Sequence, residues 1–153
     1  MSDAFHLETF FPFLLSRLSN RVSAGISETY ATRYNLSVSH WRLICLIGCY
    51  PKMSAGEVAR RGELDKVAVS RSVSALIDRG LIERTFDQGD RRRSQLRLSQ
   101  QGSAILDDIA PAATAYNSAL LEALSEDDQQ TLMRCVDKLW RQAQILESAS
   151  QDR

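Results

Sequence analysis

Four arginines occupy a stretch of seven residues that contains no acidic side chain. Arg91, Arg92 and Arg93 are consecutive, and Arg97 follows closely. Guanidinium groups bind phosphate oxygens through paired hydrogen bonds, and they also enter narrow, electronegative minor grooves of duplex DNA. A cluster of this kind on an exposed loop predicts contact with nucleic acid. The alternative is a solvated turn with no partner.

The residues around these arginines predict a two-stranded hairpin. Residues 81–86 form one strand candidate and residues 94–98 the other. In the second candidate, Leu96 and Leu98 alternate with polar side chains, which is the pattern of a half-buried strand. The segment 87–93 between them is polar and rich in turn residues, so it is expected to be the hairpin tip.

Two helices are expected directly before this hairpin. Ser54 and Glu57 have the spacing of a capping box, which begins a short helix that ends near Gly62. A second helix is expected over residues 65–79, with Gly80 closing it in a left-handed conformation. Its inward apolar stripe consists of Val69, Val73, Leu76 and Ile77. Helix, turn, helix and hairpin in this order predict a winged helix-turn-helix, whose second helix enters the DNA major groove.

The second helix also carries the candidate base-reading side chains. They are small or hydrogen-bonding groups flanked by positive charge, as a groove-reading surface requires. The set comprises Lys66, Ala68, Ser70, Arg71 and Ser74. We predict that DNA is contacted by these residues together with Arg91, Arg92 and Arg93. The alternative is an exposed helix face without a ligand.

Helical periodicity extends on the N-terminal side of this module. Apolar residues recur at helical spacing over residues 5–33, and Pro12 suits the first turn of the helix. Asn35 is expected to end this helix. Ser39 is predicted to cap the next one, which runs over residues 40–48.

Two more helices are expected on the C-terminal side. Ser99 caps a long helix over residues 100–124, in which Pro111 predicts a bend or a break. Ser125 begins the last helix, which reaches about residue 148. The fold class is therefore mainly α with a small β-hairpin wing. We divide the chain into three parts. Residues 1–36 are an N-terminal dimerisation helix, residues 37–99 are the winged module, and residues 100–153 are C-terminal dimerisation helices.

The formal net charge is zero, but its distribution is uneven. Residues 1–56 carry a net charge of +2, residues 57–97 carry +3, and residues 98–153 carry −5. The positive charge on the central segment is compatible with a DNA-binding surface. The chain has no apolar run of membrane-spanning length and no signal-peptide pattern, so we expect a cytoplasmic protein without a membrane partner.

The remaining chemistry-bearing residues do not form a catalytic or metal-binding pattern. No nucleophile, base and orienting group occur together, and neither a metal-ligand spacing nor a phosphate-binding glycine loop is present. We therefore expect neither an enzyme nor a cofactor. The cysteines Cys45, Cys49 and Cys135 are an odd number. Burial in a core is the simplest interpretation of these thiols, and oxidation sensing is the alternative.

The most specific part of the sequence resembles the MarR (multiple-antibiotic-resistance regulator) family of bacterial transcription factors. The resemblance rests on residues 80–84, on residues 90–99 and on Gly102, with Ser99 where the family usually has threonine. It implies a triangular homodimer formed by the N- and C-terminal helices. It also implies that Arg92 enters the minor groove and that Asp90 orients the wing through salt bridges.

These observations predict a homodimeric repressor of a pseudo-palindromic operator, released by a small molecule. The segment 65–71 resembles members that respond to aromatic acids or their coenzyme A thioesters. A monomer with an intramolecular helical bundle is the alternative to the dimer. The alternatives to the ligand-controlled repressor are a thiol-oxidation sensor and a winged module that binds another protein without any operator.

Overall fold

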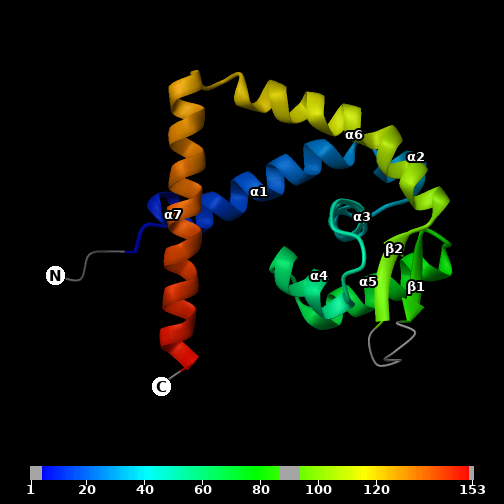
Figure 1. Ribbon diagram of the computed structural model, residues 1–153. Helices are drawn as coiled ribbons and strands as arrows, with labels where there is room; N and C mark the ends of the chain where they lie inside the picture. Colours follow the sequence, from blue (N-terminus) through cyan, green and yellow to red (C-terminus); the bar gives the residue numbers. More distant parts are fainter. Residues whose placement is uncertain (1–4, 87–93, 152–153) are drawn as a thin grey trace. The chain divides into compact units, whose positions relative to one another are not determined.

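The computed structural model describes residues 5–86 and 94–151 (Figure 1). The chain divides into two compact units, Met1–Ala113 and Thr114–Arg153. The element order is η1 (Leu7–Thr9), α1 (Phe11–Ser27), α2 (Ala31–Tyr34), α3 (Val38–Cys49), α4 (Ala55–Gly62), α5 (Lys66–Asp78), β1 (Ile82–Phe86), β2 (Ser94–Leu98), α6 (Gln100–Leu121) and α7 (Glu126–Gln151). The predicted class, mainly α with one β-hairpin, is confirmed.

The core of the first unit is built around α3. This helix contacts α1, α4, α5 and β2, and it buries Leu43, Ile44 and Ile47 almost completely. Each such side chain contributes about 1.5–3 kcal/mol through removal of apolar surface from water. Among the described residues, no polar or charged residue is fully buried. The hydrophobic effect therefore holds the helix-turn-helix elements against α3.

The N-terminal segment contains two helices, where the sequence predicts one. Pro12 lies in the first turn of α1 as expected, but α1 ends at Ser27 and the short α2 follows. Asn35 then ends α2 with a left-handed backbone, at φ 50°. The prediction that a helix ends at Asn35 is confirmed.

The predicted cap of the next helix is wrong, because Ser37 and not Ser39 is the N-cap of α3. The backbone N–H of His40 donates to the Ser37 hydroxyl oxygen at 3.1 Å. Ser37 has the extended backbone that a cap requires, whereas Ser39 already lies within the helix. The earlier start brings Val38 into the first turn of α3.

The strands β1 and β2 pair antiparallel, as predicted. Ile82 lies opposite Leu98, and Phe86 lies opposite Ser94. An isolated bridge between Met53 and Leu96 joins the hairpin to the segment before α4. The hairpin is thereby fixed to the start of the helix-turn-helix as well as to its end.

The helix α6 continues through Pro111, so the break that proline predicts does not occur. In the second unit, the Ser125 hydroxyl accepts from the N–H of Asp128 at 3.2 Å and begins α7 as predicted. The apolar residues of α7 are exposed within this unit: Leu132, Val136, Leu139, Trp140 and Leu146. Of the helices in the described chain, none combines the length and the apolar character needed to cross a membrane.

Candidate DNA-binding surface

The predicted orientation of α5 is confirmed. Of the predicted inward stripe, Val69, Val73 and Leu76 are buried and Ile77 is partly buried against the core. The candidate base-reading residues on the other faces are exposed: Lys66, Ala68, Ser70, Arg71 and Ser74. The buried stripe packs against α3 and α4, which both contact α5. Because α5 is held along one side, its polar face points outward in a fixed orientation.

Both ends of α5 are closed by specific hydrogen bonds. At the start, the Asp65 carboxylate accepts from the N–H of Ala68 at 2.8 Å. At the end, Gly80 has a left-handed backbone with φ 69°. The N–H of Gly80 donates to the carbonyl oxygen of Ile77 at 2.8 Å, and that of Leu81 to Leu76 at 2.9 Å. This is a Schellman closure, for which glycine is the favoured residue.

Replacement of Asp65 by alanine is expected to lower the free energy of unfolding by about 1 kcal/mol, because the Ala68 N–H loses its acceptor. Asp65→Asn is the matched control, since its side-chain oxygen still accepts that bond. Urea denaturation at one protein concentration measures both variants. Equal stability of Asp65→Ala and the unmodified protein would show that this cap does not stabilise α5.

A side chain just after α5 connects this helix to α2. The Arg79 guanidinium donates to the carbonyl oxygens of Tyr34 at 2.6 Å and Asn35 at 2.9 Å. In α2, the hydroxyl of Tyr34 donates to the Asp108 carboxylate of α6 at 2.7 Å, and Arg33 binds the same oxygen. The two bonds from Arg79 satisfy open carbonyl oxygens at the C-terminal end of α2 and fix the position where α5 ends.

The outward face of α5 includes a residue that the sequence analysis missed. Val67 is 59% exposed and shares its face with Arg71 and Ser74, because residues at i, i+4 and i+7 lie on one side of a helix. Valine is neither small nor hydrogen-bonding, so it did not belong to the predicted base-reading set. Its position outside the stripe of Val69 and Val73 is the signal that identifies it as an outward-facing residue.

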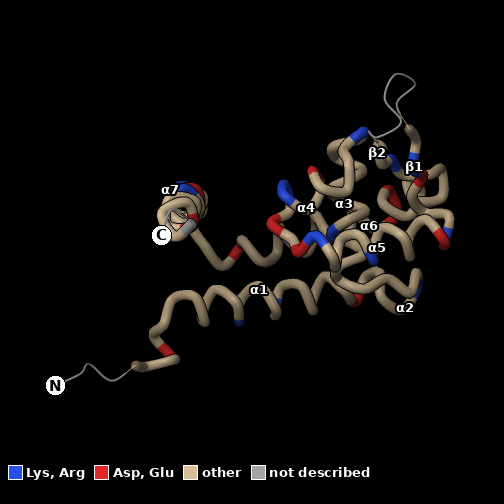
Figure 2. Tube along the Cα trace, turned by 90° about the horizontal axis from the view of Figure 1, so that it is seen from below, with Lys and Arg blue, Asp and Glu red and all other residues tan. Residues whose placement is uncertain are grey.

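Basic side chains also occur on the elements next to α5. Figure 2 shows basic positions on α4 and on the hairpin. Arg97 forms a cross-strand ion pair with Glu83 at 2.6 Å, so its charge is partly compensated. The Arg61 guanidinium lies 3.5 Å from the centroid of the Tyr50 ring. The predicted wing residues Asp90, Arg91, Arg92 and Arg93 lie outside the described residues.

The aromatic residue Trp41 is part of the core. Trp41 is buried and stacks on Tyr30 with 5.3 Å between the ring centroids. Next to it, burial and the charge of Arg79 lower the pKa of His40. Among the described residues, His40 Nδ1 is the only buried side-chain polar atom without a hydrogen-bond partner. Trp41 therefore contributes to packing in the first unit.

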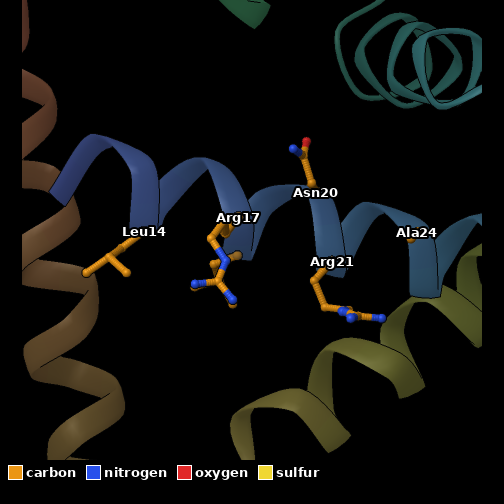
Figure 3. A pocket seen from close by; sticks show the side chains of 6 residues that line it. Leu14, Arg17, Asn20, Arg21 and Ala24 are labelled. Carbon is orange, nitrogen blue, oxygen red and sulfur yellow. The ribbon is translucent and has the colours of Figure 1, made fainter. Parts of the chain in front are cut away.

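A hollow of about 590 Å³ lies along α1 (Figure 3). Its lining comprises Leu14, Arg17, Leu18, Asn20, Arg21 and Ala24. Leu14, Arg17 and Arg21 extend to one side of the helix. Because all these residues come from one helix, the hollow is an open amphipathic face and not an enclosed ligand site.

In the described part of the chain, no group of three or more histidine, cysteine, aspartate or glutamate side chains lies close enough together to hold a metal ion.

A helix-turn-helix whose second helix turns a polar face outward is the arrangement that DNA-binding transcription regulators use. The model of the MarR family matches residues 34–93, which include α3, α4, α5 and β1. Over these residues the chain matches the MarR family of winged helix-turn-helix regulators. The resemblance inferred from the sequence is thereby confirmed.

Individual relatives agree over most of the chain. It is 23% identical to the HTH-type transcriptional repressor YetL of Bacillus subtilis, over 94% of this chain and 85% of the relative. A MarR/EmrR family regulator from Acinetobacter sp. ADP1 has the same fold, with a TM-score of 0.84 at 22% identity and coverage of 92% and 99%. The PcaV regulator of Streptomyces coelicolor, solved with its natural ligand, has a TM-score of 0.74 at 26% identity and coverage of 92% and 98%.

Proposed function

We propose that this regulator is a homodimeric repressor that binds a pseudo-palindromic operator and leaves it when a small molecule binds. The observation that carries this proposal is the exposed polar face of α5, held outward by its buried stripe. The relative YetL is a repressor, which supports the direction of regulation. A protein of this function acts on chromosomal DNA, so we place it in the cytoplasm and assign it no catalytic activity.

The DNA contacts fall into two groups. In the major groove, the α5 residues contact base edges or nearby phosphates: Lys66, Ala68, Ser70, Arg71 and Ser74. Arg91 and Arg93 contact phosphates beside the hairpin, while Arg92 enters the minor groove and Asp90 orients the tip. The phosphate contacts supply affinity, whereas the base contacts in the major groove supply sequence preference.

The exposed apolar faces support a dimer. In α1, Leu14, Leu15 and Leu18 are exposed, and in α7 a further apolar face is exposed within its own unit. Large apolar faces on water-soluble chains are usually covered by a partner. A two-fold dimer presents two α5 helices to DNA half-sites that lie about one turn of the DNA double helix apart. A stable monomer in sedimentation at micromolar concentration would contradict this assembly.

The proposed release is a population shift between two dimer conformations. DNA binding requires one separation of the two α5 helices, and a ligand that prefers another separation lowers operator affinity. A coupling of roughly 1–3 kcal/mol gives a 5–150-fold loss of affinity. The ligand-bound PcaV structure supports small-molecule control. Aromatic carboxylates and their coenzyme A thioesters are the first probes, and thermal shift and DNA release are the measurements.

The DNA-binding role is tested by titrating the full-length protein against the DNA upstream of its own gene and against a scrambled duplex. Affinity for both duplexes falls as salt rises, because counterions are released from the phosphates. A true operator keeps a preference of at least about 10³-fold over the scrambled duplex. Equal affinities for the two duplexes would instead favour a module that contacts proteins.

The thiol-sensing alternative makes a separate prediction about Cys45. Burial raises the pKa of this thiol to about 12, and the nearby Cys49 adds to the shift. The reactive thiolate form of Cys45 is therefore nearly absent at neutral pH. In a Cys49→Ser, Cys135→Ser variant, a thiol reagent should modify no group in the native protein and one group after denaturation.

Rapid modification of the remaining thiol in that native variant would contradict the assignment of Cys45 to the core. Cys49 and Cys135 are exposed and free, so the expectation of burial in a core is wrong for these two thiols. Loss of operator binding when the unmodified protein is treated with peroxide would favour the oxidation sensor. Retention of binding would favour the ligand-controlled repressor.

A further inference from the structure

Val67 is an unusual residue on the surface formed by α4 and α5. Of the residues in these two helices, all of which the structure describes, it is the only large apolar side chain that is exposed. It is the second residue of α5, next to Lys66, and lies on the outward face with Arg71 and Ser74. The N-terminal residues of a recognition helix are those that contact base edges.

The folded chain does not require an apolar residue at this position. The core stripe of α5 consists of Val69, Val73 and Leu76, which point to the opposite side. A β-branched residue also has a lower helix propensity than alanine or a straight-chain residue. Neither packing nor local structure therefore explains a valine here. Single exposed apolar residues are common on proteins, so the argument depends on where this one lies.

The chemistry of the major groove provides a partner for an isolated aliphatic group. The base edges in this groove present hydrogen-bonding groups and one apolar group, the 5-methyl of thymine. Valine has one strongly preferred rotamer in a helix, so docking it against a methyl group immobilises little. A single side chain offers too little area to hold a protein partner, for which interfaces bury on the order of 1,000 Å² or more.

We propose that Val67 packs against the 5-methyl group of a thymine in each operator half-site and is a specificity-determining residue of this regulator. This inference rests on the DNA-binding role proposed above. It adds to that role the base that one side chain of α5 recognises. Arg71 and Ser74 then bind neighbouring base or phosphate groups through hydrogen bonds, while Val67 distinguishes thymine from cytosine by contact with the methyl.

The test uses a duplex selected from a random-sequence pool by the full-length protein. Each thymine of one half-site is replaced singly by uracil, which lacks only the methyl group, and the Kd is measured by fluorescence anisotropy. At one position the Kd is expected to rise about threefold to fivefold, the effect of one buried methyl. Val67→Ala should weaken binding to the thymine duplex by a similar factor and show no further loss with uracil.

Arg71→Ala is the matched control on the same helix face. This variant should bind more weakly but keep the full sensitivity to uracil, because its valine is intact. Val67→Ala removes an exposed side chain and introduces the best helix former, so it is expected to fold, which circular dichroism verifies.

The outcomes separate this inference from the proposed function. If the protein selects a duplex but no uracil substitution changes the Kd, the thymine contact is wrong and the DNA-binding role stands. The contact is also wrong if Val67→Ala keeps the uracil sensitivity of the unmodified protein. If no duplex is selected above background, the DNA-binding role fails and the inference fails with it.

Discussion

Replacement of Arg71 by alanine is expected to weaken operator binding by about 1–3 kcal/mol while the fold stays intact. The side chain is exposed near the middle of α5, so no packing is lost when it is shortened. The reason for the loss is the removal of a charged, bidentate hydrogen-bond donor from the face proposed to enter the major groove. Anisotropy titrations at several salt concentrations measure the effect.

The salt dependence identifies which group Arg71 contacts. Loss of a phosphate contact lowers the salt slope by about one and weakens all sequences alike, whereas loss of a base contact relaxes the preference at one position. Arg134→Ala is the charge-matched control, since Arg134 lies on the side of α7 away from Leu132 and Val136. If Arg71→Ala binds the operator as tightly as the unmodified protein, the proposal that α5 lies in the major groove is wrong.

Replacement of Gly102 by alanine is expected to lower the free energy of unfolding by about 1–3 kcal/mol. A Cβ atom on Gly102 would collide with the backbone carbonyl oxygen of Leu81, which cannot move aside as a flexible side chain can. That oxygen also accepts from the N–H of Ser99 at 3.0 Å. The collision would therefore push the start of α6 away from the strand that follows α5.

Gly56→Ala is the control for this glycine. A Cβ atom on Gly56, in the first turn of α4, meets nothing within 4 Å. Alanine there is expected to leave stability unchanged or to raise it by roughly 0.5–1 kcal/mol through helix propensity. Urea denaturation of both variants at equal protein concentration provides the comparison. If the two variants are equally stable, the contact between Gly102 and Leu81 does not constrain the fold.

The winged module could be predicted closely because its signals are local. The capping box of Ser54 and Glu57, the alternation of β2 and the glycine after α5 each specify structure within a few residues. The choice between Ser37 and Ser39 as a cap could not be made in this way. Both are hydroxyl residues before the same apolar run, and only the backbone conformation at Ser37 distinguishes them.

Contacts between distant segments were also beyond prediction from the sequence. Arg79 binds the carbonyl oxygens of Tyr34 and Asn35, more than forty positions earlier in the chain. Arg97 appeared as part of a free cationic cluster, but Glu83 on the neighbouring strand pairs with it. Pairings of this kind depend on strand register and helix packing, which no local pattern encodes. The exposed Val67 was missed for a different reason, because the predicted base-reading set contains only small or hydrogen-bonding side chains.

The lack of fully buried charged residues in the described part of the first unit makes ionic strength a useful experimental variable for this protein. Its described core holds no fully buried charge. Its ion pairs, such as Arg97 with Glu83, are solvent-exposed and add little to stability. Adding sodium chloride should therefore leave the folded state intact while it displaces phosphate contacts. Dissociation seen at high salt can be attributed to the protein–DNA interface and not to melting.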